Sequence, residues 1–406
     1  MRAGAAIAVP LSTTADLEDE HMNIRSFEIK VSEVALVTLR RRLEATRWPS
    51  VIENAGWQLG MDDGFLRRLI DYWRDQFDWR RQEKRLNGYA HYIAEDQGGS
   101  THFVRFPGQG PAPLPIVLTH GWPSTFAEQL ELAAMLANPV AYGGEPADAF
   151  EVIVPSLQGF AFSSAPTVFG TNLFTIAARW ASLMTSLGFE RFIAHGGDFG
   201  AGVTTALGLK HAARLYGVHL HYIPGSYRPP LDAGKDLLAE ERAFLGAAAE
   251  WADSEGAYAH VQRTKPDTLA YALNDSPVGL AAWIVEKFRS WSDCDGEIER
   301  RFSKDALLTH VCLYWFTQSM PAAMRLYYEN AHRPLHFAAS DRVTIPVAVA
   351  RFPREAPFPP RSYVERGYRV TRWTEMARGG HFAAAEEPAL LAEDIRSFCR
   401  QFRDDP

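Results

Sequence analysis

Apolar residues recur every three or four positions in two segments near the start of the chain, and polar residues occupy the remaining positions. The first segment carries Leu36, Leu39 and Leu43. The second carries Leu66, Leu69, Ile70, Trp73 and Phe77. Both patterns predict amphipathic helices, the first capped by Ser32, and each needs another surface to cover its apolar face.

The period then changes from about 3.6 residues to two. Residues 89–95 and 101–106 alternate between apolar and polar side chains on either side of Gly98-Gly99. This pattern predicts a β-hairpin, and we expect the sheet of the protein to begin with it.

Short, continuous apolar runs follow, and helix-like sequence, such as 126–136 and 174–187, separates them. The runs cover residues 115–119, 150–155, 191–194 and 218–223. Strands buried on both faces have this composition, and helices that alternate with them indicate a mostly parallel central sheet flanked by helices.

The alternation stops after Pro224. Residues 225–340 predict successive helices, one of them capped by Ser276 with Pro277 at its first position. Strand-like sequence returns at 347–352 and 368–373, and a closing helix follows over 388–402. We therefore expect an α/β sheet interrupted by a helical cap insertion.

These patterns divide the chain into five segments. We expect a loosely ordered tail over 1–23, an N-terminal domain over 24–110, core sequence over 111–224 and 341–406, and a helical cap over 225–340. The opening apolar run is too short to span a bilayer, and Met22 offers a second start, so whether residues 1–21 belong to the native protein stays open.

Composition narrows the classes of function. The hydrophobic share of 47% and charged share of 22% are those of a globular protein. A net charge of −7 over 406 residues does not indicate the basic surface that binds nucleic acid. Three widely separated cysteines, Cys294, Cys312 and Cys399, form neither a disulfide framework nor a zinc motif. We expect a cytoplasmic protein without a membrane anchor, metal or cofactor; a homodimer stays open.

The most informative segment places one acid, Asp198, among small residues directly after a buried apolar run. Glycines at 196 and 200 give the spacing of a nucleophile elbow, in which the chain turns sharply from strand to helix. A carboxylate is ionised at neutral pH, so it can attack a saturated carbon without a base. Asp198 is therefore the predicted nucleophile.

A second motif, His120-Gly121-Trp122-Pro123, directly follows the first predicted parallel strand. In the fold that uses a nucleophile elbow, this position supplies half of the oxyanion hole. We expect the backbone amides of Trp122 and Phe199 to stabilise the negative charge that develops when an ester on Asp198 is attacked.

His381, in a glycine-rich loop after the last strand, is the predicted base. A carboxylate should orient its imidazole, and Glu355, after the strand 347–352, is our choice. Asp341 and Glu365 remain alternatives. The order nucleophile, acid, histidine is that of the α/β-hydrolase fold, which we predict for this chain.

With these residues in place, the chain resembles the microsomal-type epoxide hydrolases, including juvenile hormone epoxide hydrolases, over nearly its whole length. The shared motifs lie at 120–123, 195–198, 264–267, 273–280 and 379–384. The resemblance implies an epoxide hydrolase N-terminal domain that wraps the core and the cap. It also implies that Asp198, Glu355 and His381 act as nucleophile, acid and base.

The same resemblance implies that two cap tyrosines donate hydrogen bonds to the epoxide oxygen. They match Tyr258 and Tyr327, and Tyr328 is a neighbour that confuses the second assignment. A phenol is neutral near pH 7 and can stabilise an alkoxide. Phe199 departs from the family, because many relatives carry tryptophan there, so the pocket wall and the specificity are expected to differ.

We therefore expect an epoxide hydrolase that converts a hydrophobic epoxide to a vicinal diol through an ester on Asp198, with detoxification or catabolism as the role that the family implies. A haloalkane or haloacid dehalogenase is one alternative, because it uses the same nucleophile and fold. A non-catalytic ligand-binding relative is the other. Neither the epoxide nor the stereochemical preference can be read from the sequence.

Overall fold

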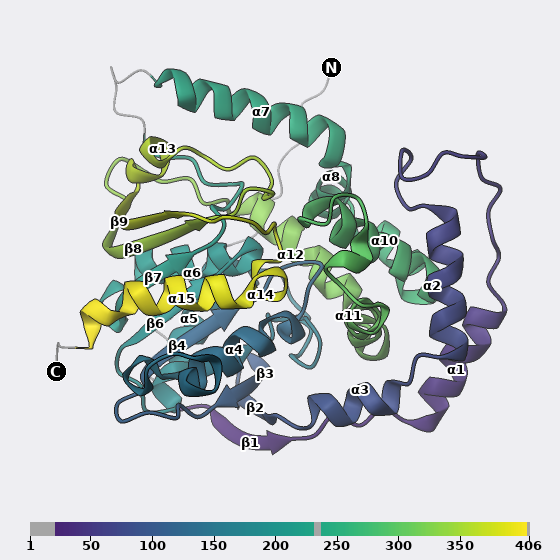
Figure 1. Cartoon of the computed structure of the whole chain (residues 1–406), viewed down its shortest axis with the longest axis horizontal. Helices are drawn as coiled ribbons and strands as arrows, with labels where there is room; N and C mark the ends of the chain where they lie inside the picture. Colours follow the sequence, from purple (N-terminus) through teal and green to yellow (C-terminus); the bar gives the residue numbers. More distant parts are fainter. Residues whose placement is uncertain (1–20, 231–236, 404–406) are drawn as a thin grey trace.

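The computed structural model describes residues 21–230 and 237–403, and within them a nine-stranded sheet forms the centre of the molecule (Figure 1). The strand order is β1-β2-β3-β5-β4-β6-β7-β8-β9. The strands are β1 (Asn23–Phe27), β2 (Ala90–Asp96), β3 (Gly99–Phe106), β4 (Leu114–Thr119), β5 (Phe150–Pro155), β6 (Phe192–Gly196), β7 (Leu215–Leu220), β8 (Val343–Arg351) and β9 (Tyr368–Glu375).

All strand pairs from β5 to β9 are parallel, whereas β1, β2 and β3 form an antiparallel extension that joins β5. The mostly parallel α/β sheet and the β2–β3 hairpin are therefore as predicted. The expectation that the hairpin begins the sheet is wrong, because β1 precedes it and pairs with β2. The sequence of β1, Asn-Ile-Arg-Ser-Phe, is short and largely polar, so it carries no alternating pattern. The strand β7 also begins three residues earlier than expected, and residues 221–223 lie beyond its end.

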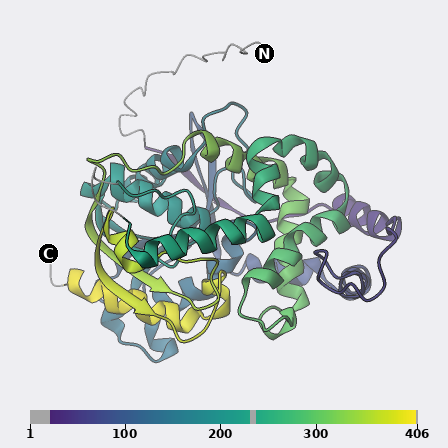
Figure 2. The ribbon, with the colours of Figure 1, turned by 90° about the horizontal axis from the view of Figure 1, so that it is seen from above.

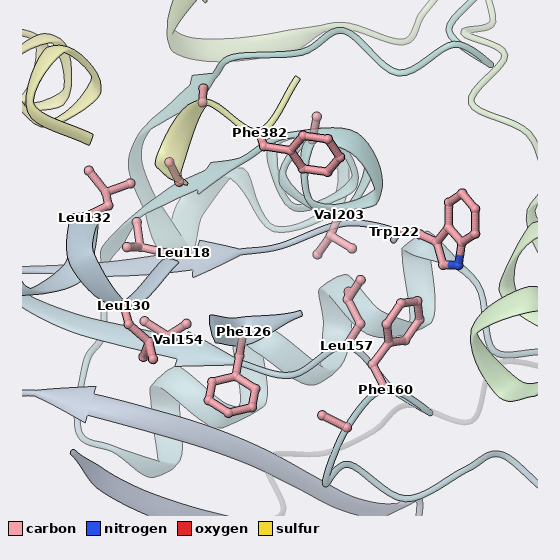
Figure 3. Packing of buried hydrophobic residues seen from close by; sticks show 14 of the residues in the cluster. Leu118, Trp122, Phe126, Leu130, Leu132, Val154, Leu157, Phe160, Val203 and Phe382 are labelled. Carbon is pink, nitrogen blue, oxygen red and sulfur yellow. The ribbon is translucent and has the colours of Figure 1, made fainter. Parts of the chain in front are cut away.

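Helices cover both faces of the parallel part of the sheet (Figure 1). The helices α4 (Leu130–Ala137) and α15 (Pro388–Cys399) contact each other over one face, and α5 (Leu173–Ser186) and α6 (Asp198–Lys210) contact each other over the other. Figure 3 shows apolar side chains from strands and helices filling the space between these layers, including Leu118, Val154 and Val203. This core fixes the ends of the strands from which the site is built.

The cap lies between β7 and β8, as the sequence predicts. Its helices are α7 (Ala239–Glu255), α8 (Ala257–Thr264), α9 (Pro266–Asp275), α10 (Pro277–Trp291), α11 (Lys304–Thr317) and α12 (Met320–His332). The Ser276 hydroxyl accepts a hydrogen bond from the amide of Gly279, 3.0 Å away, and thereby caps α10. Figures 1 and 2 show α7 running from the side of α13 (Arg361–Glu365) to α8.

The N-terminal helices α1 (Glu33–Glu44), α2 (Asp63–Asp75) and α3 (Trp79–Leu86) pack against the cap (Figure 1). The Tyr72 hydroxyl donates to Asp305 at 2.7 Å, and the Trp79 and Phe316 rings lie 4.9 Å apart. The two predicted helices are present, although Phe77 lies beyond the end of α2. The helix α3 was not predicted, because charged residues interrupt any apolar stripe.

The predicted tail lies outside the described residues except for its end. Met22 is buried, and its amide donates to the Ser186 hydroxyl at 2.9 Å, so 22 and 23 belong to the folded chain. Among the helices that the structure describes, none combines the length and apolar composition that a bilayer crossing requires.

We expect Ser276→Ala to lower the free energy of unfolding by about 1 kcal/mol, because the α10 amide at Gly279 loses its acceptor. Urea denaturation measures the change. Ser254→Ala is the control, since the Ser254 hydroxyl is exposed and binds only carbonyls of its own helix, so a change within about 0.5 kcal/mol is expected. Equal losses in both variants would contradict the capping role.

Candidate active site

Asp198 lies at the sharp turn between β6 and α6, and its backbone adopts a φ of 47°, in the left-handed region. The turn requires glycines on both sides. A Cβ at position 196 would collide with the backbone of Gly200, and one at position 200 would collide with the Thr119 carbonyl. This is the strained elbow that the glycine spacing predicts, and it raises the Asp198 carboxylate above the end of the sheet.

The two oxygens of that carboxylate have different partners. Oδ1 accepts a hydrogen bond from the Trp122 amide at 2.8 Å, whereas Oδ2 lies 3.6 Å from His381 Nε2. The Phe199 amide lies in the first turn of α6, where backbone N–H groups have no intrahelical acceptor. The Trp122 amide thus binds Oδ1, and Oδ2 faces the imidazole.

Two hydrogen bonds hold His381, one through its side chain and one through its backbone. Its Nδ1 lies 2.8 Å from Glu355 Oε1, and its backbone amide donates to the Trp291 carbonyl at 2.9 Å. The Glu355 side chain is fully buried, and its Oε1 also accepts from the Ala356 amide. The alternative acids lie elsewhere. Asp341 accepts from the amide of Ala338, and Glu365 pairs with Arg361.

The charges around His381 favour its protonated form. Burial alone would lower the pKa of the imidazole, but the carboxylates of Glu355 and Asp198 outweigh it and hold that pKa well above its usual value. Asp198 Oδ2, 3.6 Å from Nε2, is one of the two carboxylates that favour the imidazolium. Loss of the Asp198 charge would remove one of the two causes of the raised pKa.

Tyr258 on α8 and Tyr327 on α12 reach the site from the cap and meet at the Trp122 ring. The Tyr258 ring stacks on the indole at 5.2 Å and 6°, and the Tyr327 ring meets it edge to face at 5.7 Å. Desolvation, reinforced in both cases by the negative charge of Asp198, raises the pKa of each phenol well above its ordinary value. Both tyrosines are therefore neutral hydrogen-bond donors.

Tyr328, the competing neighbour, points away from the site. Its ring lies 4.3 Å from that of His332 and 6.1 Å from that of the exposed Phe169. The Phe199 ring instead packs edge to face on Tyr327 at 4.7 Å, so the residue that departs from the family pattern forms part of the wall around a site tyrosine.

Two buried residues near Asp198 were missed in the sequence. His120 accepts a hydrogen bond from the Leu157 amide at 3.1 Å, and burial lowers its pKa to about 4, so it is a neutral support of the loop after β5. Burial raises the pKa of Glu128 to about 7. Glu128 lines a cavity of about 10 Å³ together with Asp198 and His381. This cavity is near the smallest size that holds one water.

Both residues had a sequence signal. His120 opens the motif at 120–123, and Glu128 is an acid among apolar residues at the start of the predicted 126–136 segment. His219 and His221 are buried, and His219 pairs with Asp394 at 3.0 Å. In the described ranges, no cluster of three or more histidines, cysteines or acids could hold a metal ion.

Comparisons with known proteins bear on the family and the fold of the chain. Residues 24–129 match the family model "Epoxide hydrolase N terminus", and residues 115–294 match that of the alpha/beta hydrolase fold. Epoxide hydrolase 1 of Oryctolagus cuniculus is 36% identical over 96% of this chain and 91% of its own length.

Two solved structures are similar over almost their whole length. The juvenile hormone epoxide hydrolase of Bombyx mori superposes with a TM-score of 0.83 at 28% identity, covering 94% of this chain and 95% of that one. The epoxide hydrolase of Aspergillus niger has a TM-score of 0.81 at 28% identity, covering 94% and 97%.

We expect Asp198→Asn to lower the pKa of His381, because the amide removes a negative charge that favours the imidazolium. An NMR titration of the imidazole nitrogens measures it. Asp267→Asn is the matched control, since it removes an exposed carboxylate paired with Arg325 and should leave His381 unchanged. An unchanged or higher pKa in Asp198→Asn would contradict the proposed coupling.

Proposed function

This chain belongs to the epoxide hydrolase family and hydrolyses epoxides, and we propose that Asp198 is the group that bonds to the substrate. Oδ2 attacks an epoxide carbon, the bond from that carbon to the ring oxygen breaks, and the electron pair moves to the oxygen. The product of this step is a hydroxyalkyl ester of Asp198. The different partners of the two carboxylate oxygens support this assignment, since the Trp122 amide occupies Oδ1 and leaves Oδ2 for the attack.

We propose that Tyr258 and Tyr327 bind the epoxide oxygen. Negative charge moves from Asp198 to the epoxide oxygen as the ring opens. Two neutral phenols that donate hydrogen bonds to this oxygen therefore stabilise the transition state more than the ground state. The convergence of both phenols on the Trp122 ring, whose own amide binds Asp198, is the observation that carries this proposal.

We propose that Asp198 and His381 form an ion pair in the resting enzyme, and that the imidazolium supplies the proton that ring opening needs. Esterification removes the Asp198 charge, so the His381 imidazolium becomes a stronger acid and gives its proton to the new alkoxide, directly or through a phenol. Neutral His381 then takes a proton from water, and the hydroxide attacks the Asp198 carbonyl carbon. The Trp122 and Phe199 amides stabilise the oxyanion. Collapse breaks the bond to the diol oxygen, the proton of the new Asp198 carboxyl group passes to that oxygen, and the ion pair is restored.

Several further assignments remain proposals. We propose a substrate that is hydrophobic, because aromatic rings line the site, and a cytoplasmic location, because cysteine usage fits a reducing compartment. The division into an N-terminal domain (24–110), two core parts (111–224 and 341–406) and a cap (225–340) is supported by the cap helices that separate β7 from β8. A role in detoxification or catabolism rests on the family resemblance, and a homodimer is a further proposal.

A single turnover in ¹⁸O-labelled water should place the label in the Asp198 carboxylate and not in the diol, because the water oxygen bonds to the ester carbonyl carbon. Mass spectrometry of the peptide that contains Asp198 and of the diol measures both products. Label found directly in the diol after one turnover would overturn the ester mechanism.

Tyr258→Phe and Tyr327→Phe should each slow ring opening on the order of a hundredfold, because each removes a donor to the developing alkoxide. The burst rate of ester formation with a styrene oxide-like substrate measures this step. Tyr328→Phe is the matched control and should leave the rate unchanged, since that ring packs against His332. An unchanged rate of ring opening in both site variants would contradict the role of the phenols. Release of halide from haloalkanes at an undiminished rate in both variants would favour a dehalogenase.

A further inference from the structure

Lys287 is buried directly behind the aromatic wall of the site. It lies on α10 with 8% of its surface exposed, although lysine is among the residue types that are least often buried. Its Nζ lies over the Tyr258 ring, 5.1 Å from the centroid, and over the Trp291 ring at 5.7 Å. The ammonium group therefore contacts the phenol ring that is proposed to bind the epoxide.

Three groups surround the Tyr258 ring. The parallel indole of Trp122 stacks on it with centroids 5.2 Å apart, and the ring of Trp291 is tilted against it at 5.1 Å. The Lys287 ammonium lies 5.1 Å from the Tyr258 centroid. Tyr258 is thus packed between two indoles and a cation.

Two carboxylates hold the ammonium in place. Glu286, its neighbour on α10, lies 2.7 Å from Nζ, and Glu255 at the end of α7 lies 3.7 Å away. The side chains of Glu286 and Glu255 are 18% and 38% exposed, whereas that of Lys287 is 9% exposed. The two carboxylates therefore fix the position of Nζ over the Tyr258 ring.

We propose that Lys287 is a positioning residue for ring opening and acts through Tyr258, an inference that rests on the role proposed for that phenol. As the epoxide opens, negative charge leaves Asp198 and develops on the oxygen that Tyr258 holds. A cation over the phenol ring strengthens the phenol as a donor to that charge and stabilises the charge itself, and the packing of the ring against Trp122 fixes its position. Hydrolysis of the ester, which develops charge at the Trp122 and Phe199 amides, does not use this cation.

The full chain tests this proposal with Lys287→Met, which keeps an unbranched chain of similar length without the charge, and with Lys287→Arg, which keeps the charge. We expect Lys287→Met to slow ring opening on the order of tenfold, consistent with the size of a desolvated cation–π interaction. The rate of ester hydrolysis should not change. Lys287→Arg should restore most of the ring-opening rate. Lys287→Gln, a shorter polar replacement, serves the same purpose as Lys287→Met if the methionine variant fails to fold.

A double-mutant cycle with Tyr258→Phe separates this role from packing, because phenylalanine retains the ring over which Nζ lies. If Lys287 acts through the phenol hydroxyl, Lys287→Met should slow the Tyr258→Phe enzyme much less than it slows the wild-type enzyme. Lys304→Met is the matched control. Lys304 Nζ also lies over a tyrosine ring, that of Tyr72 at 5.6 Å, and binds Glu299, but it is remote from Asp198, so its loss should leave ring opening unchanged.

The outcomes distinguish the two proposals. A normal ring-opening rate in Tyr258→Phe would overturn the role of Tyr258 itself. A slow Tyr258→Phe enzyme combined with a normal Lys287→Met enzyme would overturn only the role of Lys287. Equal slowing by Lys287→Met in the wild-type and Tyr258→Phe enzymes would also overturn the role of Lys287. The same holds if Lys287→Arg does not restore the rate of ring opening although its thermal unfolding shows that the enzyme is folded.

Discussion

Trp122 is the residue on which the two halves of the site depend. Its backbone amide binds Oδ1 of Asp198, which belongs to the sheet and its elbow, while its buried ring stacks on Tyr258 and meets Tyr327, which belong to the cap. A single residue therefore sets the distance between the nucleophile and the phenols. Figure 3 shows its indole at the edge of the apolar core, so the packing of the core fixes this residue in turn.

The parts of the protein that follow from local sequence were predictable. The elbow at Asp198 needs small residues at fixed positions, and the α10 cap needs Ser276 before Pro277, so both leave a pattern in adjacent residues. The parallel strands leave apolar runs because both of their faces are buried. The helical cap was likewise recognisable, because helix-like sequence interrupts the alternation of strand and helix.

Features that depend on tertiary contacts were not predictable in this way. β1 is a strand only because β2 offers it an edge, and α3 is buried through Trp79 and Leu86 against partners distant in sequence. Glu355 was the predicted acid, but loop position alone left Asp341 and Glu365 as alternatives, and the structure brings Glu355 to within 2.8 Å of His381. The tyrosines came from family resemblance, since a single phenol on a helix carries no pattern of its own. Lys287 and Glu128 gave no expectation of a role, because burial of a charged residue is visible only in the folded chain.

The N-terminal helices have a consequence for how molecules reach and leave this site. The strands β1 to β3 are part of the sheet, while α1 to α3 grip the cap through contacts such as Tyr72 to Asp305 and Trp79 to Phe316. The N-terminal segment therefore connects the cap to the sheet, in addition to the two chain connections that join the cap to β7 and β8. A rigid-body movement of the cap away from the sheet would break the contacts of α1 to α3 with the cap. Entry of the epoxide and exit of the diol therefore need less free energy through small displacements of side chains and loops at the edge of the cap.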